Sequence, residues 1–440
     1  MGSKKRFIDV LTIGFALFAI FFGAGNLMFP PYLGLLSGGN WFKSMFGFLS
    51  TDPVVPIVGL IVTATIGGEG DSLGKRVHPL FSKILAAICM IICGPIFAVP
   101  RTAATTHEIF VMQFFPDAPT AITSFIYFGI TIYLAINPGK VLDIVGKFLT
   151  PALLVILTVI IVRSIAVPLG PIGPSSLDNE FLTGFTEGYQ TMDGLVSSLL
   201  AGLVFSDIAS RGYKDKKETF KMAVCASVVA LVLLMYVYGG LTYVGATVGS
   251  YFPPDTERVP LLMGLVELMF GTVGLRLLGI AMTLACLTTS VGITSTFGNY
   301  FEKISEGKLK YKYLVIFSAI ISFFISQFGV SKIIVLAVPV LSLVYPFVIG
   351  MIILSIFDKK IKFNATYIGF AVGIAPVAII SCLASTPLKE NEVIASLGSA
   401  ISNLPLGNVG MAWFVPALIG MIIFTIIAYG TNKTPAAAEQ

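Results

Sequence analysis

Charged side chains are scarce in this chain, and their scarcity excludes an ordinary soluble domain. Only 12% of the 440 residues are charged, whereas 56% are hydrophobic. A soluble globular protein carries about 25% charged residues. Polar stretches long enough for a separate soluble domain are also lacking, and the longest are predicted loops near 67–79, 168–180, 207–217 and 386–410. The sequence therefore predicts one membrane-embedded domain over residues 1–440.

Cysteine and histidine are rare too, with five and two residues respectively. The cysteines fall in apolar segments and are interpreted as small buried hydrophobic side chains; they are Cys89, Cys93, Cys225, Cys286 and Cys382. His78 and His107 lie at the ends of predicted spans, where a surface role is expected. Because the sequence offers neither a metal cluster nor a nucleophile–base pair, it does not favour an enzyme.

Long apolar runs recur along the whole chain. Each has roughly 20 residues, which is enough for a helix to cross a bilayer. The predicted spans are about twelve: 7–36, 42–66, 80–107, 120–136, 140–167, 181–206, 217–250, 273–302, 312–328, 332–357, 364–385 and 411–430. The amphipathic segment 258–272 is predicted to be a helix lying over an external loop.

Basic residues are distributed unevenly between alternate loops. Clusters such as Lys4–Arg6, Lys214–Lys221 and Lys359–Lys362 all fall on one side of the predicted membrane. The opposite loops hold little more than Lys43, Arg258, Lys332 and Lys389. Because basic loops stay in the cytoplasm, we predict a multi-pass protein of the cell membrane with both termini cytoplasmic. The first apolar run is too long for a signal peptide and is expected to be retained.

The first predicted span contains an unusual run, Phe21–Pro30. Gly23 and Gly25 each weaken a helix by roughly 1 kcal/mol relative to alanine, and Pro30 lacks a backbone donor. Irregular backbone at membrane depth is tolerated only where it is buried in protein or lines a cavity. The run therefore predicts a helix that opens at mid-membrane, which is typical of secondary transporters.

An opening at this point frees two kinds of backbone group. The N–H groups of a second half-helix that begins near Asn26 attract a carboxylate. The carbonyl oxygens near Ala19 and Phe22 suit a hard cation. The alternative interpretation is a glycine-mediated contact between membrane helices.

The span 181–206 is predicted to be interrupted in the same way, by Gly184, Gly188 and Gly194. Paired interruptions in two halves of a chain are the best sequence pointer to a transport site. Residues 7–167 contain five spans, an odd number, so a second repeat at 181–357 enters from the opposite face. Residues 364–430 lie outside the two inverted repeats.

The span 273–302 carries a group of small polar side chains. Ala285, Thr288 and Thr289 share one helical face, at spacings of three and four residues. Together with two carbonyls of the first span they give about five uncharged oxygens, a set that suits sodium better than magnesium or calcium. The alternative is that the hydroxyls bond back to their own helix.

Two motifs carry a resemblance to known proteins. The first resembles motifs of sodium-coupled amino-acid transporters of the leucine-transporter fold, and it comprises Gly25-Asn26 with Phe29-Pro30, together with Ala285–Ser290. The whole chain resembles most the branched-chain amino acid:cation symporter family, and the likeness covers nearly all residues. The segments that indicate it are Phe21–Pro30 and Gly188–Asp193. It implies an all-α membrane fold of about twelve helices, with a 5+5 inverted repeat, broken helices 1 and 6, and two extra helices. It also implies sodium-coupled import of leucine, isoleucine and valine.

The resemblance further implies roles for particular residues. The implied sodium ligands are Ala19, Phe22, Ala285, Thr288 and Thr289. The substrate carboxylate would be held at Gly23, Ala24 and Gly25, while Asn26 matches one ligand of a second sodium site. The implied substrate contacts in the second break are Gly188, Tyr189, Gln190, Thr191 and Met192. Backbone carbonyls there would accept the ammonium, and Tyr189 and Met192 would border the aliphatic side chain.

Several ionisable residues lie at membrane depth and are expected to face the interior and pair, because a buried charge is costly there. They are Asp52, Arg101, Glu187, Asp193 and Glu267. Asp52 and Arg101 are a predicted pair, and Asp193 is expected to make a gating or structural hydrogen bond rather than to touch substrate. The alternatives are a proton-coupled carrier of the same fold, a carrier of another small zwitterion or nucleobase, and a channel. The sequence shows no titrating group near Thr288 that would serve proton coupling.

Overall fold

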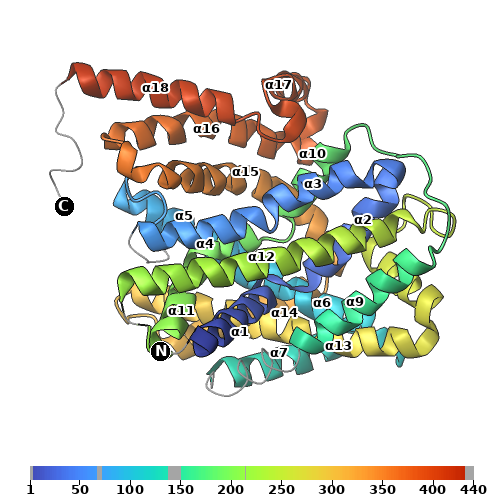
Figure 1. Cartoon of the computed structure of the whole chain (residues 1–440). Helices are drawn as coiled ribbons and strands as arrows, with labels where there is room; N and C mark the ends of the chain where they lie inside the picture. The colour runs from blue at the N-terminus through green and yellow to red at the C-terminus, as the bar shows by residue number, and fades with distance from the viewer. Residues whose placement is uncertain (1–2, 67–71, 137–149, 214, 432–440) are drawn as a thin grey trace.

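The computed structural model describes residues 3–66, 72–136, 150–213 and 215–431, and these residues form helices and connecting loops without any strand. Most of the helices run roughly side by side in one bundle (Figure 1). The α-helices are α1 (Ser3–Phe21), α2 (Ala24–Ser37), α3 (Trp41–Thr51), α4 (Val54–Thr65), α5 (Pro79–Ile91), α6 (Ala98–Ile109), α7 (Thr120–Ile136), α9 (Thr150–Ala166), α10 (Glu180–Tyr189), α11 (Asp193–Ser210), α12 (Lys216–Ala246), α13 (Arg258–Ile304), α14 (Tyr311–Ser326), α15 (Val330–Ile356), α16 (Asn364–Ala384), α17 (Glu392–Ser402) and α18 (Phe414–Gly430).

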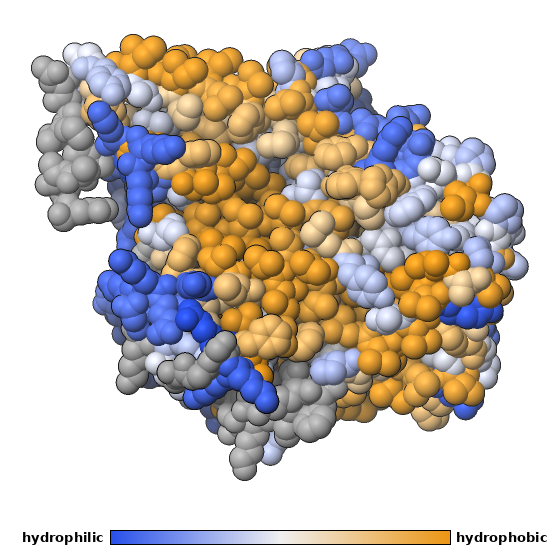
Figure 2. All heavy atoms as spheres, viewed as in Figure 1, coloured by the Kyte–Doolittle hydropathy of each residue, from blue (hydrophilic) through white to orange (hydrophobic). Residues whose placement is uncertain are grey.

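The helices have the length and the surface of a membrane bundle. Seven helical stretches of the described chain are long and apolar enough to cross a bilayer, and further apolar helices are shorter. A broad apolar band covers the middle of the face shown in Figure 2, with polar side chains gathered toward the ends of the helices. Each predicted span overlaps one helix or a pair of helices. The number of spans stays a prediction.

Four of the predicted spans are not single α-helices. The span 7–36 divides into α1 and α2, and the span 181–206 divides into α10 and α11. The span 80–107 divides into α5 and α6, with a π-helical turn at Ile92–Ile96 between them. The span 42–66 also divides, between Thr51 and Val54, and this break was not predicted. Pro53 explains it, because its ring disfavours the helical conformation of Asp52. Asp52 is accordingly extended, with φ −138° and ψ 112°.

Two predictions on external segments have different outcomes. The helix predicted at 258–272 is present as the first part of α13, which kinks at Gly271, where φ is 63°. Glycine permits this positive φ without steric cost. The stretch 386–410 was predicted to be a loop, and this is wrong, since it contains α17 with Asn391 as its N-cap. Some predicted segments lie partly outside the described residues: the loops 67–79 and 207–217, and residues 140–149 of one span.

Polar contacts join the start of α1 to the junction of α11 and α12. The Tyr213 hydroxyl donates to Asp9 over 2.7 Å, and Arg211 forms an ion pair with Asp9 at 3.6 Å. The start of α1 and the end of α18 lie at the same end of the bundle (Figure 1). This arrangement is compatible with both termini on one side of a membrane, which stays a prediction.

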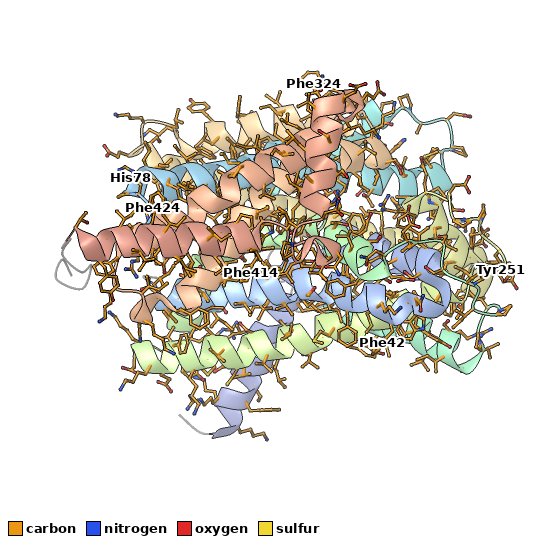
Figure 3. All side chains as sticks on the ribbon, turned by 90° about the horizontal axis from the view of Figure 1, so that it is seen from above. Phe42, His78, Tyr251, Phe324, Phe414 and Phe424 are labelled. Carbon is orange, nitrogen blue, oxygen red and sulfur yellow. The ribbon has the colours of Figure 1, made fainter. Side chains whose placement is uncertain are left out.

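The two histidines differ from each other. His78 is exposed and its Nδ1 accepts from the backbone N–H of Leu80, so it caps α5 as a surface residue. Figure 3 shows His78 and Tyr251 at opposite ends of the bundle. The surface role predicted for His107 is wrong, because His107 is buried and its Nδ1 lies 2.9 Å from the Thr123 hydroxyl.

The cysteine prediction is correct for three residues and wrong for two. Cys89, Cys93 and Cys286 are buried, as small hydrophobic side chains would be. Cys225 is exposed and Cys382 is half-buried. Membrane proteins face lipid with apolar side chains, so an apolar segment does not by itself predict burial inside the protein.

Candidate transport site

The first helix break lies where the glycines predict it. Helix α1 ends at Phe21 and α2 begins at Ala24. Gly23 is extended, and its N–H donates to Oδ1 of Asn26 over 3.1 Å. The backbone N–H groups in the first turn of α2, at Ala24, Gly25 and Asn26, have no intrahelical partner because of their position. The break therefore presents donors to its surroundings.

The second break is present, but its cause differs from the predicted one. Helix α10 ends at Tyr189 and α11 begins at Asp193, with Met192 in the left-handed conformation at φ 68°. Left-handed backbone costs a non-glycine residue about 1–2 kcal/mol. The prediction that Gly188 and Tyr189 belong to opened backbone is wrong, since both lie inside α10.

The glycines of α10 have a packing role instead. A Cβ on Gly184 would collide with the backbone carbonyl of Ser44, and one on Gly188 would collide with the side chain of Thr51. Both contacts are made by α3, so the glycines let α10 and α3 approach each other closely. This is the glycine-mediated contact that was considered as the alternative for the first span.

A pocket lies between the two breaks and is walled by α2, α6, α11 and α13. Its lining residues are Gly23, Gly25, Asn26, Cys93, Ala98, Arg101, Thr102, Thr191, Met192, Asp193, Val196, Thr289 and Ile293. Six of the residues singled out from the sequence as binding residues or ion ligands are among them: Gly23, Gly25, Asn26, Thr191, Met192 and Thr289. The two interrupted segments thus meet at one cavity, as a transport site requires.

Other predicted binding residues lie outside this lining. Tyr189 stacks on Tyr345, with ring centroids 4.2 Å apart and planes 7° from parallel. The backbone carbonyl of Gln190 accepts a hydrogen bond from Nη1 of Arg101 over 2.6 Å. Other lining residues carry no sequence signal for a binding site, because they are small or apolar side chains within helical segments: Cys93, Ala98, Thr102, Val196 and Ile293.

The predicted ion ligands lie on α13 and at the end of α1, and one of them contacts the first break. The Thr289 side chain lies 3.5 Å from the position a Cβ would take on Gly23, so α13 packs directly against the break. The buried Oγ1 of Thr289 has no hydrogen-bond partner among the described residues. Thr288 instead donates to the carbonyl of Ala285 over 2.8 Å, which is the alternative arrangement considered for this helix. Ala19 lies in the last turn of α1, and Phe22 follows this helix directly, in the break.

Asn26 connects two carboxylates inside the membrane region. Its Nδ2 lies 3.0 Å from Asp52 Oδ2, 2.7 Å from Asp193 Oδ2 and 2.8 Å from the Tyr238 hydroxyl. Because an amide nitrogen carries two hydrogens, three acceptors share its donors. Asp193 therefore makes the structural hydrogen bond expected of it. The predicted pair of Asp52 with Arg101 is wrong, since no such ion pair occurs among the described residues.

The remaining ionisable residues also separate into two cases. Glu187 pairs with Arg258 at 2.6 Å, and the Arg258 guanidinium lies 4.0 Å from the centroid of the Tyr32 ring. The expectation of an interior pair is thus confirmed for Glu187. It is wrong for Glu267, which is exposed on the first part of α13.

The fold and the two opposed breaks define an integral membrane transporter, and similar solved structures agree on the fold. The inward-facing conformation of Mhp1 aligns with a TM-score of 0.60 at 13% identity, over 95% of this chain and 91% of that one. MhsT in complex with L-phenylalanine aligns with a TM-score of 0.57 at 16% identity, over 94% and 98% of the two chains. At this identity the likeness shows the leucine-transporter-like fold alone.

Sequence comparison gives the family. A profile described as branched-chain amino acid transport protein matches residues 6–430. The branched-chain amino acid permease BraB of Bacillus subtilis (strain 168) is 36% identical over 423 residues, which are 94% of each chain. The permease BrnQ of Escherichia coli (strain K12) is 32% identical over 447 residues, covering 99% of this chain and all of the relative. The chain belongs to the branched-chain amino acid transport family, and it is a transporter rather than an enzyme.

Proposed function

We propose that this chain imports leucine, isoleucine and valine by sodium symport, through alternating access to the pocket between the two breaks. The observation that carries the proposal is the meeting of both breaks at one pocket in a family of branched-chain amino acid transporters. A channel does not need two broken helices around a binding pocket, whereas many carriers are built in this way.

The substrate would lie across the pocket between the breaks. Its carboxylate would lie at Gly23, Ala24 and Gly25, where the N–H groups of Ala24 and Gly25 have no intrahelical partner. Its ammonium would face backbone carbonyls at Gln190 and Thr191. Met192, Val196 and Ile293 supply apolar lining for the side chain. An apolar pocket separates aliphatic side chains by only about 1–3 kcal/mol per methylene. One carrier for all three branched-chain amino acids therefore follows naturally.

Sodium would lie between the end of α1 and α13, held by oxygens of Ala19, Phe22, Ala285, Thr288 and Thr289. The unpartnered Thr289 hydroxyl beside Gly23 supports this placement. Inward movement of one positive charge is favoured by about 2.3 kcal/mol per 100 mV of membrane potential.

Transport would proceed by movement between two inverted repeats, 7–167 and 181–357, with the third part 364–430 outside them. The moving bundle would consist of α1–α4 and α10–α12, rocking against α5–α7, α13 and α14. In a cell membrane with both termini cytoplasmic, α1 would then be the cytoplasmic half of the first broken helix.

Proton coupling is the second candidate, and one observation favours it. Two carboxylates on one amide nitrogen repel each other when both are ionised, which favours a shared proton or a neighbouring cation. Asp193 also lines the same pocket as Thr289. The prediction that no titrating group lies near the Thr288 region is therefore wrong, and the coupling ion has to be tested directly.

Uptake of labelled leucine into proteoliposomes tests the proposal. We expect accumulation with an imposed sodium gradient and none with a proton gradient alone. Accumulation with protons alone would move the coupling to Asp52 and Asp193, and failure with both gradients would contradict the substrate class.

A pair of variants on α13 tests the ion ligand. We expect Thr289→Val to weaken sodium activation of uptake by about 10- to 100-fold, because a hydrogen-bonding or ligating oxygen near a charge contributes about 1.5–3 kcal/mol. Thr296→Val is the matched control, since the Thr296 hydroxyl donates to its own helix, at the carbonyl of Gly292. Equal sodium activation in both variants would contradict the placement of the ion.

A further inference from the structure

Arg101 is a buried cation in the wall of the pocket. It lies on α6, is 3% exposed and lines the cavity between the breaks. A charged side chain at the centre of a membrane helix costs about 2.5–3.5 kcal/mol, so a pairing group is expected. Within the described residues, however, no acidic oxygen lies within 4.0 Å of the Arg101 guanidinium.

The guanidinium also retains unused donors. An arginine carries five N–H donors in a planar fork, and the described residues accept from Arg101 only at the carbonyl of Gln190, over 2.6 Å. The Arg101 Cζ lies 5.5 Å from the centroid of the Phe29 ring. Such a fork fits the two oxygens of a carboxylate.

The position of Arg101 joins both breaks. A Cβ on Gly25 would lie 2.8 Å from Nη2 of Arg101, so the guanidinium rests against the first turn of α2. The Gln190 carbonyl that it contacts belongs to the second break. An anion that approached the free N–H groups of α2 would therefore meet the guanidinium at the same place.

Arg258 provides a contrast from the same neighbourhood. Its Cζ lies 5.4 Å from the centroid of the same Phe29 ring. Unlike Arg101, it already has an acidic partner, Glu187, at 2.6 Å. One arginine beside Phe29 is thus part of a protein ion pair, whereas the other has no acidic oxygen within 4.0 Å among the described residues.

We infer that Arg101 binds the substrate carboxylate through its guanidinium and so restricts the pocket to amino acids that carry a free carboxylate. Asp193 lies in the wall of the same pocket and adds negative charge near the backbone carbonyls that would face the substrate ammonium. The two charges together match a zwitterion, whereas an amine or an amide meets Arg101 with no anion. This inference rests on the proposed function, since it takes a branched-chain amino acid as the substrate.

Calorimetric titration of the purified full chain in sodium buffer tests the role of Arg101. Leucine is compared with leucinol, which has the same side chain and ammonium group but no carboxylate. The variants are Arg101→Gln, Arg101→Lys and the control Arg258→Gln. We expect wild-type protein to prefer leucine over leucinol by about 100-fold, the size expected for one buried charge pair.

Arg101→Gln should lose leucine affinity by about 100-fold while binding leucinol nearly unchanged, so that the preference disappears. Arg101→Lys keeps the charge without the fork and should lose about tenfold for leucine only. Arg258→Gln should keep the preference intact. If Arg101→Gln does not fold, the test rests on Arg101→Lys, whose affinity should fall for leucine but not for leucinol.

A parallel loss of both ligands in the Arg101 variants would overturn the inference and leave Arg101 as a structural residue. That result would leave the proposed function standing, because wild-type protein would still bind leucine. Wild-type protein that binds neither ligand would overturn the proposed function, and with it the assignment of Arg101.

Discussion

The two helix breaks of this transporter arise in different ways. The first contains Gly23, and Gly25 follows in the first turn of α2; both residues weaken a helix locally. The second, Gln190–Met192, contains no glycine, and its backbone is held by neighbours. Arg101 donates to the Gln190 carbonyl, and the Cys93 thiol lies 3.7 Å from the carbonyl oxygen of Met192. One break is thus set by local propensity and the other by tertiary contacts.

This difference separates two functions of glycine in the same fold. In the first break, the lack of a side chain leaves room for the pocket and for Arg101. In α10, the lack of a side chain at Gly184 and Gly188 brings two helices together. Substitution at Gly25, beside Arg101, should therefore alter transport, whereas substitution in α10 should alter stability.

The largest effect is expected for Gly25→Ala. The added Cβ would lie 2.8 Å from Nη2 of Arg101 and 2.9 Å from Cε2 of Phe29, so the guanidinium has to move. A misplacement of about 1 Å costs roughly 100-fold in a positioned site, and we expect leucine uptake to fall by that amount. Initial rates in proteoliposomes measure it. Gly292→Ala is the matched control, because no atom lies within 4 Å of a Cβ there, and uptake equal in both variants would contradict the account.

An intermediate effect, on stability, is expected for Gly184→Ala. Its Cβ would meet the backbone carbonyl of Ser44, which cannot move without shifting α3. Overpacking of this kind costs about 1–3 kcal/mol, so the midpoint of thermal unfolding in detergent should fall by several degrees. The KM for leucine in the fraction that remains folded should stay within about twofold. An altered KM with unaltered thermal stability would show that Gly184 belongs to the site.

The smallest effect is expected for Gly23→Ala. Gly23 has φ −100° and ψ −171°, which any residue adopts, and its Cβ would make an ordinary 3.5 Å contact with Thr289. Leucine uptake should therefore remain within about threefold of wild type, a change of less than 1 kcal/mol. A loss as large as that of Gly25→Ala would show that the open backbone itself, and not the space beside Arg101, requires glycine in this break.

The same comparison shows how far the sequence could predict the molecule. The first break could be predicted from the sequence, because Gly23 and Gly25 weaken the helix locally. The second was located only approximately, because Met192 takes a left-handed conformation that its own side chain disfavours. The division at Asp52 and Pro53 was missed, although proline gives a local signal for it.

Residues whose roles depend on distant partners could not be predicted from one sequence. Arg101 was assigned to Asp52, but the fold places Asn26 between Asp52 and Asp193 instead. His107 is buried and its ring contacts Thr123, which lies on another helix. Local chemistry identified which residues are unusual, and tertiary contacts decided which of them meet.

In the proposed function, one pocket between the two breaks binds leucine and sodium together. Binding linkage requires that sodium raise the affinity for leucine, and leucine the affinity for sodium, by the same factor. The most direct test is leucine titration of the purified protein at fixed pH, in sodium and then in potassium. We expect leucine to bind at least about tenfold more tightly in sodium than in potassium, a coupling of about 1.4 kcal/mol. Thr289→Val should remove this difference. Equal leucine affinity of the wild-type protein in sodium and potassium would contradict a shared pocket for the two ligands.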